Sequence, residues 1–249
     1  MSLSLYLGGA IPGISGLMHD SDWQNYEDPT MKTNYSISKN TIDNGFDCDI
    51  KLSGTITPKT WLKLKPFISY SFNKVYFISS DAEGWYGDSS SMKLHSGQKI
   101  NVSWDDESAL HLKKGELCSI DYYRNTHNLF IGGEADFSFF ENFTVLTSIS
   151  IAPINYISSV DTHWSNTNKT SGTMYNDRIL GYFNYYSGKI GLEYKPLIFM
   201  TVGLCGKYSY LHLMKGVTYT KGTATKKYPT KPSTSSYSGA SGRLIDASF

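Results

Sequence analysis

The chain has 249 residues, a formal net charge of +1, 18% charged residues and 14% aromatic residues. A net charge so close to zero offers no attraction to a polyanion, which excludes a nucleic-acid-binding function. Soluble proteins carry about 25% charged residues. The low charge, the many aromatics and the mean hydropathy of −0.32 therefore indicate either a membrane β-barrel, whose lipid-facing and lumen-facing residues alternate, or a large soluble β-sandwich.

Neither a long apolar segment nor a cysteine framework occurs in the sequence. Without about 18 consecutive apolar residues, no transmembrane helix is expected. The first residues, MSLSLYLGGAIPG, lack the basic start and long apolar core of a signal peptide. We therefore expect that the chain is not exported or that it lacks its natural N-terminus. Cys48, Cys118 and Cys205 are odd in number and show no CxxC spacing, which predicts neither disulfides nor a zinc site.

Alternation with a period of two residues predicts strands along most of the chain. In residues 44–57, for example, Phe46 and Ile50 share one face, whereas Asp47 and Asp49 take the other. We predict about eight strands, near 2–11, 42–57, 61–79, 114–126, 128–139, 142–158, 178–194 and 197–214, with a partial strand at 237–249. The two segments that meet near residue 127 form either two strands or one long strand. Several runs exceed the roughly 9 to 11 residues that a tilted strand needs to cross a membrane, so strands should project beyond the bilayer.

The predicted connections alternate between short turns and long polar segments. The turns are expected at 57–60, 140–142 and 194–197, and the long segments at 13–41, 80–112, 159–177 and 215–236. The last of these segments contains several lysines among Thr, Ser, Gly and Pro, which predicts a solvated loop; they are Lys221, Lys226, Lys227 and Lys231. The alternation of short turns with long loops is typical of outer-membrane barrels. We expect residues 1–249 to form a single β-barrel domain without internal repeats.

Two short polar clusters stand out as a candidate site. Asp20 and Asp22 lie in the run GLMHDSDW, and Asp161 and His163 lie in the run SSVDTHW. Residues at i and i+2 of a strand point to the same face. Each cluster therefore presents two polar side chains together, and both clusters fall where a strand gives way to a long loop. They are expected on the same rim, where they could hold and deprotonate a water.

These runs resemble the omptin family of outer-membrane aspartyl-type proteases. The resemblance rests on GLMHDSDW followed by FDCDIKLSGTI, and on NYISSVDTHW followed by YFNYYSGKIGLEY, in the family's order. It implies an all-β fold, an antiparallel transmembrane β-barrel of omptin type in the bacterial outer membrane. The family has ten strands and an active-site groove at the extracellular rim. The resemblance aligns the start of this chain with the family's third strand, so we expect the barrel to be incomplete at its N-terminus.

The resemblance also implies roles for the four polar residues. In omptins an Asp–His pair activates a water, and an opposite Asp–Asp pair helps to bind it; here these would be Asp161 with His163, and Asp20 with Asp22. His163 would be the general base, because imidazole titrates near neutral pH, and Asp161 would orient it. Since adjacent carboxylates raise one pKa, one of Asp20 and Asp22 is expected to hold a proton.

The expected partners follow from the same resemblance. It implies a peptide or protein substrate, contact with outer-membrane lipid, and neither a cofactor nor a metal, and it leaves open whether lipopolysaccharide is required. Omptins prefer basic residues beside the cleaved bond and bind them through acids on the groove floor. One such acid lies two residues before the Asp of the D-x-H motif, where this chain has Ser159. The cleavage-site preference therefore stays open.

Two other functions are compatible with the sequence. A catalytically inactive outer-membrane barrel could act as an adhesin or structural surface protein, as the Thr/Ser/Lys-rich segment 215–236 suggests. A soluble β-sandwich binding module would need no signal peptide. The two clusters could also be ordinary polar loop starts. Beside them, His19 either contacts the acids or lies on the rim, and Trp23 and Trp164 either wall the groove or belong to an aromatic girdle.

Overall fold

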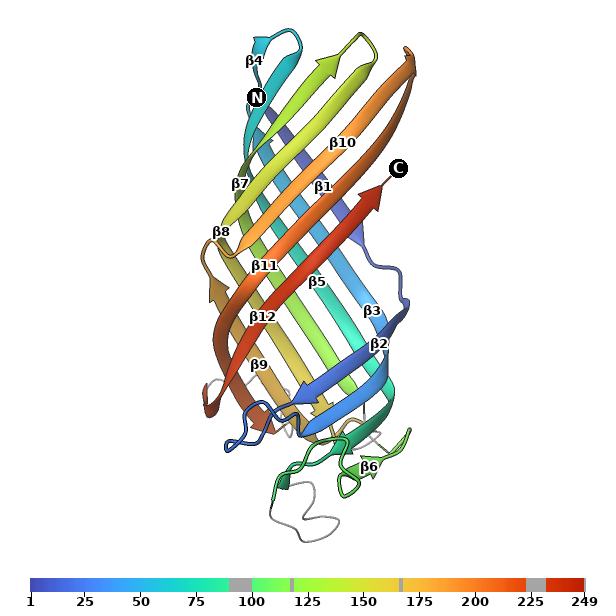
Figure 1. Cartoon of the computed structure of the whole chain (residues 1–249), viewed down its shortest axis with the longest axis vertical. Coiled ribbons are helices and arrows are strands. Elements are labelled where there is room, and N and C mark those ends of the chain that lie inside the picture. The colour runs from blue at the N-terminus through green and yellow to red at the C-terminus, as the bar shows by residue number, and fades with distance from the viewer. Residues whose placement is uncertain (90–99, 117–118, 166–167, 223–231, 249) are drawn as a thin grey trace.

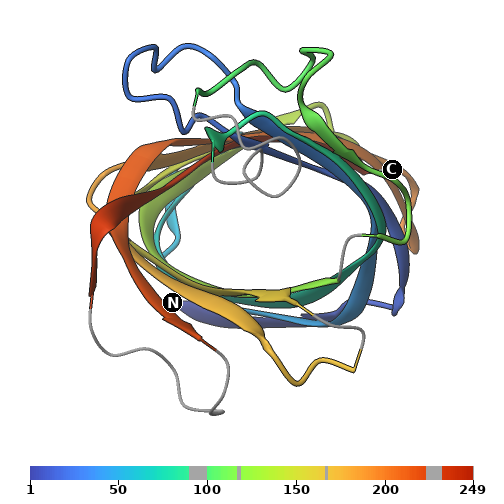
Figure 2. The same cartoon turned by 90° about the horizontal axis from the view of Figure 1, so that it is seen from below.

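One antiparallel sheet curls round on itself into a barrel (Figures 1 and 2). The computed structural model describes residues 1–89, 100–116, 119–165, 168–222 and 232–248, so Cys118, Lys226, Lys227 and Lys231 lie outside the described residues. The sheet of the described part has 12 strands. They are β1 (Ser2–Gly9), β2 (Gly13–Asp22), β3 (Asn34–Ser53), β4 (Ile56–Lys59), β5 (Leu62–Tyr86), β6 (Leu110–Leu112), β7 (Ile120–Phe139), β8 (Phe143–Trp164), β9 (Gly172–Gly181), β10 (Tyr185–Leu197), β11 (Met200–Gly222) and β12 (Pro232–Ser248).

The strands form eight long lines in the described part of the chain. β1 and β2 both pair with β3, so they make one interrupted line. β9 and β10 likewise both lie between β8 and β11. Together with β3, β5, β7, β8, β11 and β12, these lines confirm the prediction of about eight strands. β4 and β6 are short strands that pair with β5.

The strands extend further toward the long loops than the alternation predicted. Each of the four segments predicted as long loops contains strand residues at its ends, and segment 13–41 holds the whole of β2. Those loop boundaries are wrong for a physical reason. Beyond the membrane both faces of a strand meet polar surroundings, so the apolar–polar alternation fades while the hydrogen-bonded ladder continues.

Around residue 127 the chain forms one strand, β7, which was one of the two alternatives. Three further boundaries differ from the prediction. The run 178–194 is interrupted at 182–184, where Phe183 has a φ of 54°. The turn at 140–142 is present. The other two turns lie at 60–61 and 198–199, so each begins after the proline of the predicted turn. Pro58 and Pro196 instead lie where the pairing register shifts, a position that tolerates a missing N–H.

The outer face of the barrel is apolar and its interior is polar. Large apolar side chains are exposed around the wall, among them Leu5 (63%), Ile149 (74%) and Ile190 (61%). The interior holds ion pairs, Lys51 Nζ to Glu134 Oε1 at 2.6 Å and Lys65 Nζ to Asp136 Oδ2 at 2.5 Å. A cavity of about 540 Å³, lined in part by Lys51, lies beside the first pair. Because a soluble protein buries its apolar side chains, the β-sandwich alternative is wrong.

Over the described residues, no helix is both long enough and apolar enough to cross a membrane.

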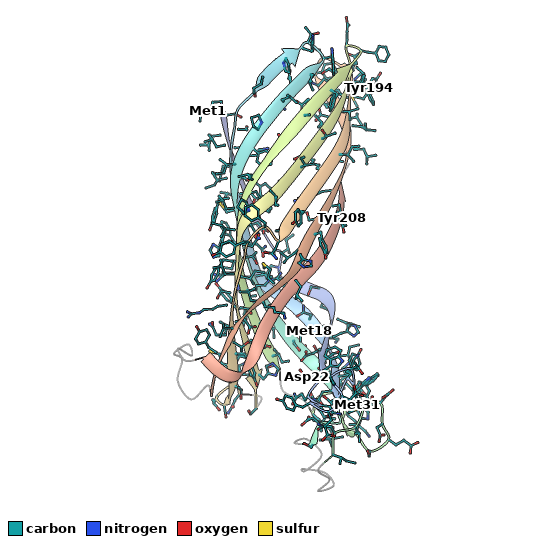
Figure 3. All side chains as sticks on the ribbon, turned by 60° about the vertical axis from the view of Figure 1, so that its left-hand side comes forward. Met1, Met18, Asp22, Met31, Tyr194 and Tyr208 are labelled. Atoms are coloured by element: carbon teal, nitrogen blue, oxygen red, sulfur yellow. The ribbon has the colours of Figure 1, made fainter. Side chains whose placement is uncertain are left out.

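The outer apolar band ends well before the strands reach the long loops. On β3 the exposed apolar side chains stop at Phe46, and on β8 they stop at Ile154. Beyond this level the outer wall carries charged pairs such as Lys39 Nζ with Asp81 Oδ2 at 3.0 Å. Figure 3 shows Asp22 at this projecting end, far from Tyr194 at the other end. The strand ends that carry the polar clusters therefore lie outside the membrane-spanning segments.

Candidate active site

Asp20 and Asp22 lie at the C-terminal end of β2, and both side chains point to the same face of the strand. In the pairing with β3 they lie opposite Ser36 and Asn34. Asn34 is buried, and its Nδ2 donates to Asp22 Oδ2 over 3.4 Å. Burial and the charges of Asp20 and Asp22 raise the pKa of Tyr86 to about 12. The Tyr86 hydroxyl therefore stays protonated beside the two carboxylates.

Asp161 and His163 come from the end of β8 and contact each other. His163 Nε2 lies 2.9 Å from Asp161 Oδ2, and the two side chains are 41% and 28% exposed. Since a neutral imidazole carries its proton on one nitrogen, this bond places the proton on Nε2 and leaves Nδ1 free as a base. The pair therefore combines an oriented imidazole with access to water and substrate.

The two pairs face each other across the mouth of the barrel. Three strands, β3, β5 and β7, separate β2 from β8 in the sheet. Even so, each pair acts on the other's ionisation. Burial and the charge of Asp22 raise the pKa of Asp20, the charge of His163 opposes them, and that of Asp161 adds to them. The structure thus brings all four predicted residues together.

The carboxylates also act on the imidazole. Burial alone would lower the pKa of His163, but the hydrogen bond and charge of Asp161 and the charges of Asp20 and Asp22 outweigh it, so the pKa is raised above its ordinary value. A raised pKa makes His163 a stronger base and stabilises the imidazolium that forms when it takes a proton.

Two tyrosines flank the Asp–His pair. Asp161 lies in direct register between Tyr122 of β7 and Tyr175 of β9. The Tyr175 ring meets His163 edge-on, with centroids 5.3 Å apart. Burial, followed by the charge of Asp161, raises the pKa of Tyr175, and burial raises that of Tyr122. Both hydroxyls therefore remain protonated donors at neutral pH.

The indole that follows His163 lies on the other face of the wall. Trp164 Nε1 donates to Asp121 Oδ2 over 2.9 Å, and Lys169 Nζ lies 2.7 Å from Asp121 Oδ1. Because neighbouring strand residues point to opposite faces, Trp164 fixes the end of β8 from outside and does not wall the groove.

His19 and Trp23 also lie away from the acids. His19 Nδ1 is 2.7 Å from the Tyr35 hydroxyl, and Trp23 is 53% exposed. His19 belongs to a group of contacting rings that we call the outer aromatic cluster, which consists of His19, Tyr35, Trp85, Trp104 and His111. This cluster supports the wall on which Asp20 and Asp22 lie.

The two tyrosines and two charged residues of the groove, Arg124 and Asp177, were not predicted from the sequence. Tyr122 and Arg124 are in register with Asp161 and Ser159, which only the strand pairing reveals. One signal was available, because Tyr175 and Asp177 repeat the i, i+2 spacing of the two recognised clusters. Within the described residues, no group of three or more His, Cys, Asp or Glu is arranged to hold a metal.

Comparisons with known proteins agree with this architecture. The model of the omptin family matches residues 1–242. Among solved structures, the crystal structure of the outer membrane protease OmpT from Escherichia coli is similar, with a TM-score of 0.69 and 16% sequence identity. The match covers 98% of this chain and 74% of that chain. No curated protein matches the sequence.

Proposed function

The chain belongs to the omptin family, a family of bacterial outer-membrane proteases, and on this premise we propose that it is an endopeptidase whose water is activated by Asp161 and His163. The observation that carries the proposal is the 2.9 Å contact of His163 Nε2 with Asp161 Oδ2. The charge of Asp22 acts on this imidazole from the other side, and that of Asp20 adds to it when Asp20 is ionised. The substrate is a peptide or protein lying between the two pairs.

The proposed reaction needs only side chains and water. His163 Nδ1 takes a proton from the water as its oxygen attacks the peptide carbonyl, and Asp161 stabilises the imidazolium. Asp20, the carboxyl with the raised pKa, donates a hydrogen bond to the carbonyl oxygen as negative charge develops there. His163 then gives its proton to the leaving amine, and the C–N bond breaks.

The outer face suggests the lipid partner. Its exposed apolar band suits the acyl chains of the outer membrane. A requirement for lipopolysaccharide is tested by measuring turnover of the refolded protein with and without added lipopolysaccharide. Turnover that is the same in both conditions would show that lipopolysaccharide is dispensable.

Substitution of the base tests the proposed function. In detergent-refolded protein, His163→Ala should lower the cleavage rate of fluorogenic peptides by about 10² to 10⁴, the range of general-base catalysis. His127→Gln is the matched control, because His127 bonds to the Tyr70 hydroxyl on the outer wall and belongs neither to the proposed machinery nor to the outer aromatic cluster. Circular dichroism should show intact β-structure in both. Unchanged cleavage in His163→Ala would refute the proposal, and absence of cleavage by the wild type would favour the catalytically inactive adhesin.

A further inference from the structure

One polar row of side chains lies next to Asp161 on the way into the barrel. The pairing of β7, β8, β9 and β11 brings four residues into a single cross-strand row: Arg124, Ser159, Asp177 and Thr218. Ser159 lies two residues before Asp161 on the same strand, so both point to the same face. This row is therefore the floor beside the proposed reacting centre, within reach of a substrate side chain next to the cleaved bond.

The row contains two opposite charges that are not paired with each other. Asp177 Oδ2 accepts a hydrogen bond from Ser159 Oγ over 3.0 Å, and Asp177 Oδ1 accepts one from Thr218 Oγ1 over 2.6 Å. Arg124 lies on the other side of Ser159. Its Nε is buried and, within the described part of the chain, has no hydrogen-bond partner. The hydroxyls hold Asp177 in place and leave its charge uncompensated.

Both charges reach the same point of the groove. The hydroxyl of Tyr122 lies on the row above, and its pKa, which burial raises, is lowered by the charge of Arg124 and raised by that of Asp177. Directly opposed side chains have Cβ atoms about 5 Å apart, so Arg124 and Asp177 lie roughly 10 Å apart across Ser159. Ser159 is buried and the Tyr122 side chain hydrogen-bonds to it, so a substrate side chain reaches the two charges from the Tyr122 side of the row.

We propose that Arg124 and Asp177 select the substrate side chain beside the cleaved bond as an opposed pair, and that the side chain that fits is a neutral carboxamide, as in Gln or Asn. The amide oxygen accepts from Arg124, and the amide NH₂ donates to Asp177. An ammonium is repelled by Arg124 and a carboxylate is repelled by Asp177, so neither is favoured. The inference rests on the proposed peptidase function and names the substrate class of that site.

Charge removal tests the opposed pair. Fluorogenic peptides that differ only in Gln, Lys or Glu beside the cleaved bond are compared by kcat/KM on the refolded full chain. Wild type should favour Gln. Arg124→Gln should shift the preference toward Lys, and Asp177→Asn toward Glu, each by roughly tenfold, the ratio that one charge-assisted hydrogen bond supports. Arg178→Gln is the matched control, because Arg178 lies over the Tyr219 ring on the opposite face from Asp177.

The outcomes separate the inference from the proposed function. Faster cleavage of the Lys or Glu peptide by wild type, or the same peptide ranking in Arg124→Gln and Asp177→Asn, would overturn the inference. If wild type cleaves no peptide, the same three peptides are measured by fluorescence anisotropy for binding. If the two variants shift the peptide affinities in opposite directions, the opposed pair is supported although the peptidase proposal has failed. If wild type and both variants bind the three peptides with equal affinity, the inference and the peptidase proposal are both overturned.

Discussion

At the scale of the residue, the site is governed by four ionisable groups that alter one another. Asp20 and His163 both have a raised pKa, and the charge of Asp22 contributes to both shifts. Burial is the largest cause of the raised pKa of Asp20. For this reason Asp20 is the carboxyl that we propose as the donor to the substrate carbonyl.

Removal of the Asp22 charge should shift the pH profile. In Asp22→Asn the pKa of His163 falls, because one negative charge that stabilises the imidazolium is lost. The free base then persists to lower pH, so the acidic limb of kcat/KM is expected to move to lower pH, together with a lower maximal rate. Rate measurements between pH 5 and 9 would check this. An acidic limb that moves to higher pH would contradict the assignment of His163 as the base.

At the scale of the element, the outer aromatic cluster connects the segment around β6 to the wall that carries the acids. The His111 ring stacks on Trp85 at 4.8 Å with an interplanar angle of 6°, and His111 Nε2 lies 2.8 Å from Glu83 Oε1. Trp104 contacts Tyr35 at 4.8 Å between ring centroids. Tyr35 in turn pairs with Ser21, the residue between Asp20 and Asp22 on β2.

Truncation of the cluster should therefore weaken the site from outside. Trp85→Ala removes contacts with three rings, two stacked and one edge-on. Each contact is worth about 0.5–1.5 kcal/mol, so kcat/KM is expected to fall several-fold without loss of the barrel. Trp61→Ala is the matched control, because Trp61 stacks on Phe137 at the short-turn end, far from the acids. Equal kcat/KM in Trp85→Ala and wild type would show that the cluster does not support the site.

At the scale of the whole molecule, the outer apolar band makes the folded barrel stable in lipid. Ile190 is exposed in the middle of β10, whereas Ser71 on β5 lines the interior cavity opposite Asp49. In lipid, Ile190→Arg should destabilise folding by about 2–4 kcal/mol, the cost of a cation at the bilayer midplane. Ser71→Arg is the control and should cost little, because it faces a carboxylate and water. Equal folding stabilities in lipid vesicles would argue against this orientation of the strands.

The period of two residues was enough to predict the strands within the membrane. There, lipid on one face and polar groups on the other impose alternation, as Phe46, Ile50, Asp47 and Asp49 illustrate. It was not enough beyond the bilayer. β2 was predicted as loop because neither of its faces is confined to lipid near Asp20, and its strand geometry comes from pairing with β3.

From the sequence alone, the period of two residues predicted the wall of the barrel and its interior, and i, i+2 spacing put the two residues of each polar cluster on one face of a strand. That Asp20 and Asp22 lie opposite Asp161 and His163 was expected only from the family resemblance, and it follows from the way the sheet curls across three intervening strands. The fold also brings Arg124 and Asp177 to either side of Ser159. Cross-strand register joins residues far apart in the chain, and no local spacing encodes it.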